Sequence, residues 1–320
     1  MQSSHNFASS LQSFAVNSLF SQHCLSPDIM NIYGLCLQML ATDATHRSVD
    51  HHHASNSSRR PNFHTVLQRV GKTVLRPGGT EGTRKLHSWS ELNRDGTAIE
   101  LSSGMGSGGV ALAKATGACV TLSDMDTSRL EMASQIARDQ GVDSELIEIM
   151  QLNMRHVDEE LEQHHYDTAI IEASLSHYNT KEKRAILKGL AKRADELLLH
   201  EICFRCDDFT LKELNHIKQD MSRALAIGFH PLTVDGWTNV LHEAGYEVKR
   251  SETGPMKVLN PVTVLQDEGL KRAAKIAWNI ATDASIRSRV VETRRAIKSH
   301  QHDLGYILIR AVANNGQALN

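Results

Sequence analysis

Short apolar runs alternate with segments of helical periodicity from about Leu67 to the end of the chain. The apolar runs predict seven strands, at residues 98–101, 119–123, 145–151, 168–172, 196–201, 246–251 and 305–312. Between them, residues 128–140, 180–190 and 211–226 carry apolar side chains at the three- and four-residue spacing of amphipathic helices. This alternation predicts an α/β fold whose parallel strands are joined by right-handed crossovers and whose ligand site lies at the carboxyl edge of the sheet.

The composition changes near residue 64. Residues 1–63 are rich in Ser, His and Asn, so they predict a poorly ordered extension, followed by a folded domain over 64–320. Within the extension, 27–41 is apolar enough for a helix that docks on the domain, and the His tract 51–53 is typical of a linker rather than a metal site. The extension lacks an Arg-rich or positively charged start, which favours a cytoplasmic protein. Its abundant Ser and few acids keep a plastid or other organelle leader as the alternative.

The bulk composition suits a soluble enzyme. The 320 residues are 40% hydrophobic, and 35 basic against 37 acidic residues give a formal charge of −2, so no basic excess indicates nucleic acid. No apolar run approaches the roughly twenty residues that span a bilayer. Five cysteines form no obvious disulfide framework. The single C-x-x-C pair, Cys203 and Cys206, is too little for a zinc site, and we expect no metal.

The most informative segment is 98–110, with sequence AIELSSGMGSGGV. An apolar strand leads into glycines and a helical pattern leaves them, so the backbone can turn sharply and present its N–H groups to a ligand. Gly104, Gly106 and Gly109 fit the dinucleotide pattern G-x-G-x-x-G, and Asp124 ends the next predicted strand, where an acid can bind ribose hydroxyls. The segment therefore predicts a nucleoside-bearing cofactor.

Glu100 counts against a dinucleotide and favours another nucleoside-bearing cofactor. In a dinucleotide fold the strand runs almost directly into the first glycine, whereas here a carboxylate and two serines intervene. The string Glu-x-Ser-x-Gly-x-Gly resembles the first motif of class I S-adenosylmethionine (SAM) dependent methyltransferases, in which Ser102 takes the place of a usual glycine. The resemblance implies that Glu100 lies near the methionine amino group of SAM, with Ser102, Gly104 and Gly106 under the cofactor.

The same resemblance assigns residues after the second and third strands. It implies that Asp124 binds the ribose and that Met125 packs against the adenine. Asn153 stands where the family commonly has Asp beside the adenine, and Met154 is its apolar neighbour. Other interpretations stay open, because Asp124 or its neighbour Asp126 could instead cap the helix beginning near residue 127, and Asn153 could simply form a turn.

The loop after the fourth predicted strand faces both cofactor and acceptor in methyltransferases of this class. Glu172, Ser174, His177 and Tyr178 are therefore candidates for substrate contact, with His177 and Tyr178 as candidate catalytic residues and Glu172 on the cofactor side. The alternatives are that Glu172 accepts backbone hydrogen bonds from the glycine turn and that His177 is a packing residue.

The wider resemblance runs from about Val70 to Val312 and is carried by the segments 72–80, 233–246 and 253–257. These look like small-molecule methyltransferases of the UbiE-like branch. The resemblance implies a Rossmann-like, seven-stranded sheet of order 3-2-1-4-5-7-6, with the last strand antiparallel and helices on both faces. An extra helical segment, 256–303, precedes that strand. It could form a lid lined by Met256 and Trp278, or a surface pair that makes a homodimer contact.

Together these patterns predict a SAM-dependent methyltransferase acting on a small-molecule acceptor through a sulfur, oxygen or carbon nucleophile. A thioether acceptor needs no base, whereas a hydroxyl or acidic carbon does. The alternatives are an NAD(P)-dependent oxidoreductase and a catalytically silent SAM-fold subunit. Tyr178 and Lys181 are three residues apart rather than the four of the short-chain dehydrogenase pair, which counts against the oxidoreductase.

Overall fold

The computed structural model describes residues 61–314. The predicted helix at 27–41 and the His tract at 51–53 lie outside the described residues. The division of the chain at residue 64 stays a prediction. Asn62 does, however, cap a helix that begins at Phe63, because its side chain accepts a hydrogen bond from the Thr65 N–H.

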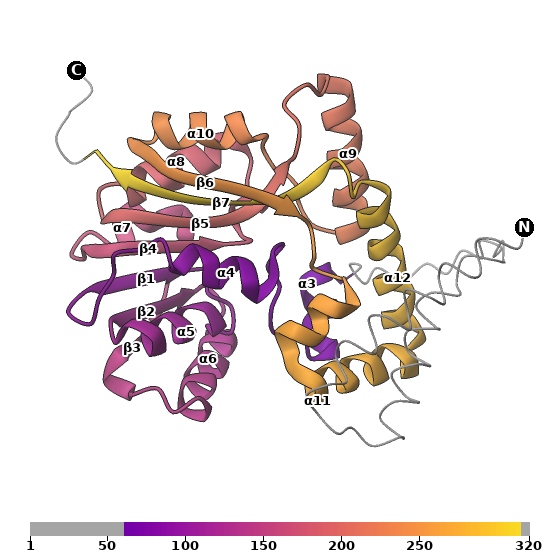
Figure 1. Cartoon of the computed structure of the whole chain (residues 1–320), viewed down its shortest axis with the longest axis horizontal. Helices are drawn as coiled ribbons and strands as arrows, with labels where there is room; N and C mark the ends of the chain where they lie inside the picture. The colour runs from indigo at the N-terminus through magenta and orange to yellow at the C-terminus, as the bar shows by residue number, and fades with distance from the viewer. Residues whose placement is uncertain (1–60, 315–320) are drawn as a thin grey trace, which may run out of the picture. The chain divides into compact units, whose positions relative to one another are not determined.

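The described residues form one seven-stranded sheet in the order β3-β2-β1-β4-β5-β7-β6, as predicted. Every neighbouring pair is parallel except the two that β7 makes, with β5 and β6. Figure 1 shows this directly, since the arrowhead of β7 points opposite to that of β6. The strands are β1 (Thr97–Leu101), β2 (Cys119–Asp124), β3 (Ile147–Gln151), β4 (Tyr166–Glu172), β5 (Ala194–Phe204), β6 (Tyr246–Pro255) and β7 (Leu304–Ala313).

Strands β5 and β6 are longer than their apolar runs predict. The expected strand 196–201 extends to Phe204, and the expected strand 246–251 extends to Pro255. Both extensions pair with β7, which reaches Phe204 on one side and Pro255 on the other. Hydrogen bonding to a neighbouring strand thus lengthens β6 through a mostly polar stretch that carries no apolar signal of its own.

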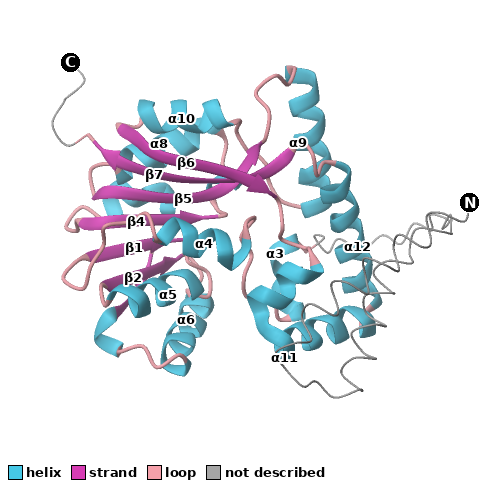
Figure 2. Ribbon diagram, viewed as in Figure 1, coloured by secondary structure: helices cyan, strands magenta, loops and turns pink. Residues whose placement is uncertain are grey.

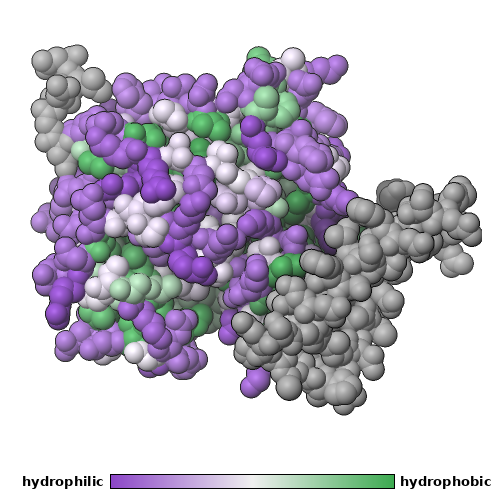
Figure 3. All heavy atoms as spheres, in the orientation of Figure 1, coloured by the Kyte–Doolittle hydropathy of each residue, from purple (hydrophilic) through white to green (hydrophobic). Residues whose placement is uncertain are grey.

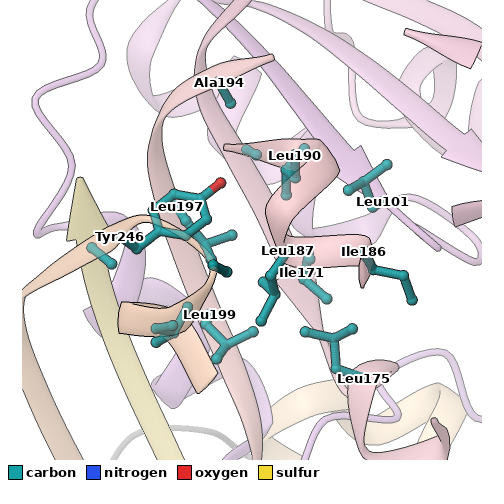
Figure 4. Close-up of a cluster of buried hydrophobic side chains, with 14 of the residues drawn as sticks. Leu101, Ile171, Leu175, Ile186, Leu187, Leu190, Ala194, Leu197, Leu199 and Tyr246 are labelled. Atoms are coloured by element: carbon teal, nitrogen blue, oxygen red, sulfur yellow. The ribbon is translucent and has the colours of Figure 1, made fainter. Parts of the chain in front are cut away.

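Helices cover both faces of the sheet (Figure 2). One face carries α4 (Gly79–His87), α5 (Ser107–Thr116) and α6 (Thr127–Asp139), and the other carries α7 (Val157–Glu160), α8 (Thr180–Leu190) and α10 (Val234–Glu243). Successive residues of the central strands point to opposite faces and so enter two separate cores. Ile99 and Ile171 pack with α8 and α10, whereas Ala98 and Ile170 pack with α4, α5 and α6. Figure 4 shows the first of these cores, where Ile186, Leu187 and Leu190 of α8 meet the strands.

A third group of helices gathers beyond the carboxyl ends of the parallel strands, on the right of Figure 1. It comprises α3 (Phe63–Val70), α9 (Leu211–Leu225), α11 (Pro261–Thr282) and α12 (Ala284–Ser299). These helices share a core of their own with the end of β5, including Leu67, Phe204, Met221, Phe229 and Ile276. The predicted extra segment before the last strand is thus α11 and α12, which pack on α3 and α9.

The face of the molecule in Figure 3 is mostly hydrophilic, with apolar residues in small separate groups. Within residues 61–314, no helix combines the length and the apolar character needed to cross a membrane.

Candidate cofactor and acceptor site

The glycine segment turns at the carboxyl end of β1 through three residues of positive φ. Ser102 has φ 54°, Gly104 has φ 58° and Gly106 has φ 70°. Glycine adopts this left-handed region most easily, which explains why the related motif usually has glycine where this chain has Ser102. Gly106 also begins α5 as its N-cap, so the N–H groups at the start of α5 lie beside the turn.

Glu100, at 1% exposure, joins the glycine segment to a buried arginine. One carboxylate oxygen, Oε2, accepts the Gly109 N–H at 2.7 Å. The other, Oε1, lies 3.1 Å from Nη2 of Arg76. The Arg76 Nε also forms an ion pair with Glu172, so one guanidinium bridges the ends of β1 and β4.

Glu172 is held in turn by Thr83 and His200. Its Oε1 accepts the Thr83 hydroxyl at 2.6 Å and lies 3.0 Å from Nδ1 of His200. Because Nε2 of His200 accepts the Gly78 N–H at 3.0 Å, the His200 proton sits on Nδ1 and the ring is neutral. The buried cluster therefore contains two carboxyl groups and one permanent cation.

The two carboxyl groups titrate in opposite directions. Burial raises the pKa of Glu100 to about 7, and the nearby Glu172 carboxylate adds to this rise against the opposing effect of Arg76. Burial by itself would raise the pKa of Glu172 too, but Arg76 and His200 hold it down at about 2. With both ionised, the cluster carries a net negative charge, which favours a cationic ligand group.

Arg76 is positioned by the extra helix α11. Two adjacent carboxylates of α11 bind the backbone on either side of it: Glu268 accepts the Thr73 and Val74 N–H groups at 2.8 and 2.9 Å, and Asp267 accepts the Thr80 N–H at 2.8 Å. The segment that carries Arg76 is thereby fixed to α11. Part of the extra segment thus supports the polar cluster, a role that the sequence did not indicate.

Of the two acids that the sequence offered as a cap for the helix near residue 127, Asp126 takes that role and Asp124 does not. Asp126 is the N-cap of α6, because its Oδ1 accepts the Ser128 N–H at 3.0 Å. Asp124, 4% exposed, instead accepts the Gly104 N–H at 3.0 Å with Oδ2. The carboxylate of Asp124 therefore ties the end of β2 to the glycine turn, and its contact with a ribose stays a prediction.

The predicted adenine neighbours have different surroundings. Met125 is 63% exposed and lines the cavity described below. The Asn153 side chain accepts the Arg155 N–H at 3.2 Å and caps a short 3-10 helix, η2 (Met154–His156), while Met154 is buried in the core. Neither Asn153 nor Met154 is among the described residues that line the cavity. The contact of Asn153 and Met154 with adenine stays a prediction. The hydrogen bond that the Asn153 side chain accepts from the Arg155 N–H is the kind expected of a turn-forming residue.

The loop after β4 is organised by Glu201 on β5. Its carboxylate accepts the N–H groups of Ser174, Leu175 and Ser176 at 2.8, 2.6 and 3.1 Å. Ala173, at the start of this loop, has φ 54°. A fully buried carboxylate that satisfies three successive donors holds the loop in one conformation.

A cavity of about 270 Å³ lies among these groups at the carboxyl edge of the sheet. Its walls come from the glycine turn, the ends of β2 and β4, and α3. The residues that line it are Asn62, His64, Gln68, Thr73, Leu75, Arg76, Glu100, Ser102, Ser103, Gly104, Met105, Ser107, Asp124, Met125, Arg129, Glu172, Ala173, Ser174, His177, Tyr178 and Ile227. We call this space the polar cavity.

A second, smaller space of about 50 Å³ adjoins the polar cavity. The two share His64, Leu75, Ala173 and His177. The remaining lining residues are apolar, and half of them come from helices beyond the sheet: Phe63, Leu67, Pro77, Ile202, Met221, Leu225, Phe229, Met256, Val258 and Ile297. We call this space the apolar pocket. Met256 lines it, whereas Trp278 is 63% exposed and is not among the lining residues, and a lid or acceptor role of the segment 256–303 stays a prediction.

The two candidate catalytic residues both line the polar cavity. His177, at the end of the 3-10 helix η3 (Leu175–His177), lies with its Nε2 3.1 Å from Nε2 of His64 on α3. The ring of Tyr178 lies under the guanidinium of Arg155, 4.6 Å from the ring centroid. Burial raises the pKa of Tyr178, which keeps its phenol protonated.

Comparisons with known proteins agree with this geometry. A family model described as lysine methyltransferase matches residues 81–199, from α4 into β5. A SAM-dependent methyltransferase from Thiobacillus denitrificans, solved with S-adenosylhomocysteine (SAH), shares the fold, with a TM-score of 0.58, 15% identity and coverage of 80% of this chain and 100% of that one. The chain is a SAM-dependent methyltransferase of the class I fold.

One further solved structure and one further protein sequence are similar to this chain. A putative sarcosine dimethylglycine methyltransferase from Galdieria sulphuraria has a TM-score of 0.57 at 10% identity, covering 73% of this chain and 85% of that one. An uncharacterized protein of Haemophilus influenzae is 27% identical over 249 residues, which are 77% of this chain and 96% of that protein. The specific likeness to the UbiE-like branch stays a prediction.

The methyltransferase site contains residues that the sequence analysis missed. Arg76 lies in the segment 72–80 that carries the wider resemblance but had no assigned role, His64 lies before that segment, and Glu201 on β5 organises the loop after β4. The one available signal was the pair His200-Glu201 at the end of an apolar strand, because two polar residues on a buried strand must find partners. Adjacent strand residues face opposite ways, so His200 reaches the cluster and Glu201 the loop.

The C-x-x-C pair of the methyltransferase lies apart from the site. Cys203 is buried in the core, where burial raises the pKa of its thiol to about 12, and Cys206 is exposed. Among residues 61–314, no cluster of three or more His, Cys, Asp or Glu side chains is arranged to hold a metal.

Proposed function

We propose that this methyltransferase transfers the methyl group of SAM to a small, apolar and uncharged acceptor. The observation that carries the proposal is the apolar pocket, which opens from the polar cavity and shares four lining residues with it. Apart from His64 and His177, all its lining residues are apolar. Such a lining binds an apolar molecule by removing its surface from water.

The residues of the polar cavity fit SAM. When bound, SAM supplies a methyl group made electrophilic by a sulfonium. We assign its methionine end to the cluster of Arg76, Glu100 and Glu172, which carries a net negative charge when Glu100 is ionised and then suits a cationic ligand group, and its ribose to Asp124. The lack of a side chain at Gly108 lets this cluster pack against α5, because an added Cβ would lie 2.5 Å from Nη2 of Arg76 and 2.8 Å from Oε1 of Glu100.

A lysine side chain is the second candidate acceptor, because the matching family model is described as lysine methyltransferase. A lysine ammonium entering the apolar pocket would lose its hydration, and none of the described lining residues of that pocket is a carboxylate that could replace it. The chemistry of the pocket therefore favours an uncharged acceptor over a lysine.

A turnover assay that follows SAH release tests the proposal. The acceptors are a panel of small apolar phenols, thiols and thioethers, and a set of lysine-containing peptides. We expect turnover with members of the small-molecule panel and none with the peptides. Turnover with the peptides alone would contradict the proposal.

Two substitutions on one helix locate the acceptor. Leu225 lines the apolar pocket near the end of α9, whereas Leu211, at the start of the same helix, is 80% exposed. Leu225→Trp should fill the pocket and abolish methyl transfer while SAH affinity stays within about threefold of wild type. Leu211→Trp should change neither. Unimpaired turnover by Leu225→Trp, with folding confirmed by SAH binding, would place the acceptor elsewhere.

A further inference from the structure

We propose that His64 and His177 together accept a proton from the acceptor, so that the nucleophilic atom of the acceptor is a protonated hydroxyl or thiol. This inference rests on the proposed function, because it names the class of acceptor for the same apolar pocket. It adds His64, a residue of the first described helix, to the reacting groups of the site.

The two histidines stand where the two spaces meet. Both line the polar cavity and both line the apolar pocket. Their rings are in edge contact, with centroids 5.0 Å apart and planes at 79°. They are the only titratable side chains among the described residues of the apolar pocket. An acceptor in that pocket therefore has no other described side chain beside it that can take a proton.

Hydrogen bonds fix which nitrogen carries each proton. Nδ1 of His177 lies 2.9 Å from the Gly228 carbonyl oxygen, which only accepts, so Nδ1 of His177 is protonated. In neutral His177 the lone pair is then on Nε2, which accepts a proton shared with Nε2 of His64 at 3.1 Å. His64 in this state is protonated on Nε2 and has its lone pair on Nδ1.

The surroundings keep His64 uncharged before reaction. Burial lowers the pKa of His64 to about 3, and the positive charges of His177 and Arg129 act in the same direction. His230 is the further titratable group that interacts with His177. Because His64 holds an added proton weakly, the proton passes through the shared hydrogen bond to Nε2 of His177, whose Nδ1–H the Gly228 carbonyl already binds.

The step balances with no further reactant. A lone pair on the acceptor oxygen or sulfur forms the new bond to the methyl carbon, and the electrons of the breaking carbon–sulfur bond return to sulfur to give SAH. The acceptor proton moves to Nδ1 of His64, and the proton on Nε2 of His64 moves to His177. The histidine pair gains one positive charge as the sulfonium loses one, so the charge of the site is conserved.

Binding of 4-nitrophenol to the SAH complex of the full chain tests the inference without turnover, because ionisation of this phenol is visible in its absorption spectrum. We expect wild-type protein to lower the pKa of bound 4-nitrophenol by about one unit or more. His64→Gln should bind the phenol within about threefold of wild type but lose that shift. The control His242→Gln changes an exposed histidine of α10 and should keep it.

The outcomes separate the inference from the proposed function. If 4-nitrophenol binds but ionises as in water, or if His64→Gln keeps the shift, the inference is wrong while the apolar acceptor site stands. If 4-nitrophenol does not bind at all, or if Leu225→Trp fails to weaken its binding, the assignment of the apolar pocket fails and the inference falls with it.

Nitrogen NMR of the full chain gives a second reading that needs no ligand. At neutral pH we expect His177 protonated on Nδ1 alone and His64 on Nε2 alone, with His64→Gln altering the titration of His177. A doubly protonated His64 at neutral pH, or a His177 titration that does not respond to His64→Gln, would overturn the pair.

Discussion

The polar cavity and the apolar pocket share a wall but are built in different ways. The polar cavity is formed largely by turns at the ends of β1, β2 and β4, where backbone N–H groups meet buried carboxylates such as Glu100 and Asp124. The apolar pocket is formed mainly by side chains from α3, α9 and α12 and from the segment that follows β6, which are far apart in the sequence. The donor half is thus built around a local motif, whereas the acceptor half depends on tertiary packing throughout.

Substitutions in the two spaces should therefore have different effects. A substitution in the polar cavity disturbs hydrogen bonds and charges that hold the sheet edge together, so it affects both folding and cofactor binding. A substitution in the apolar pocket changes volume and should alter acceptor choice first.

Loss of Arg76 should have the largest effect. Arg76→Met leaves Glu100 and Glu172 buried without their cation, which should cost about 3 to 5 kcal/mol of unfolding free energy in denaturant titration. The control Arg155→Met breaks an ion pair with Glu182 whose side chains are 50% and 33% exposed, and should cost under about 1 kcal/mol. Equal losses of unfolding free energy in the two variants would show that the buried ion pairs of Arg76 stabilise the protein no more than an exposed ion pair does.

Gly109→Ala should have the second largest effect. An added Cβ would lie 2.4 Å from Cδ2 of Leu122 and 2.9 Å from Oε2 of Glu100, so we expect a loss of about 1 to 3 kcal/mol in stability together with weaker SAH binding. Gly141→Ala is the control, because Gly141 has φ 65° and nothing lies within 4 Å of its added Cβ. Gly141→Ala should leave SAH affinity unchanged. An equal fall in SAH affinity in both variants would show that the collision of the added Cβ with Leu122 and Glu100 is not the cause.

Asp124 and Asp126 provide a matched pair at the end of β2. Asp124→Ala should weaken SAH binding by about 1 to 3 kcal/mol in calorimetry if its carboxylate binds the ribose. Asp126→Ala should leave SAH affinity unchanged and cost about 1 kcal/mol of stability, because it removes the cap of α6. Unchanged SAH affinity in Asp124→Ala would show that Asp124 does not bind the ribose and only holds the Gly104 N–H.

The smallest effect concerns His64 and pH. The unfolded chain protonates His64 near its ordinary pKa of 6.5, whereas in the folded protein this pKa is about 3. Stability should therefore fall as the pH drops below 6.5, by up to about 1.4 kcal/mol per pH unit, an effect absent above pH 6.5. His64→Gln should remove this part of the slope between pH 6.5 and 5.5, whereas His242→Gln should not. Identical slopes in wild type and His64→Gln would show that His64 is not kept neutral by the fold.

The same contrast explains how much could be predicted from the sequence. The strand order and the segment 98–110 carry local signals, since apolar runs mark the strands and the glycines need positive φ at Gly104 and Gly106. Arg76 and His64 gave no such signal, because their partners lie tens of residues away and are chosen by packing. Met154 has an apolar side chain that suits either a ligand or a core, and the structure buries it in the core.

A crystal structure of the full chain with SAH tests the central claim most directly. We predict that SAH occupies the polar cavity, with its ribose hydroxyls on Asp124, its homocysteine end at Arg76 and Glu100, and its sulfur facing the wall formed by His64 and His177. SAH bound outside the polar cavity, or bound within it with the sulfur turned away from His64 and His177, would contradict the division into a donor half and an acceptor half.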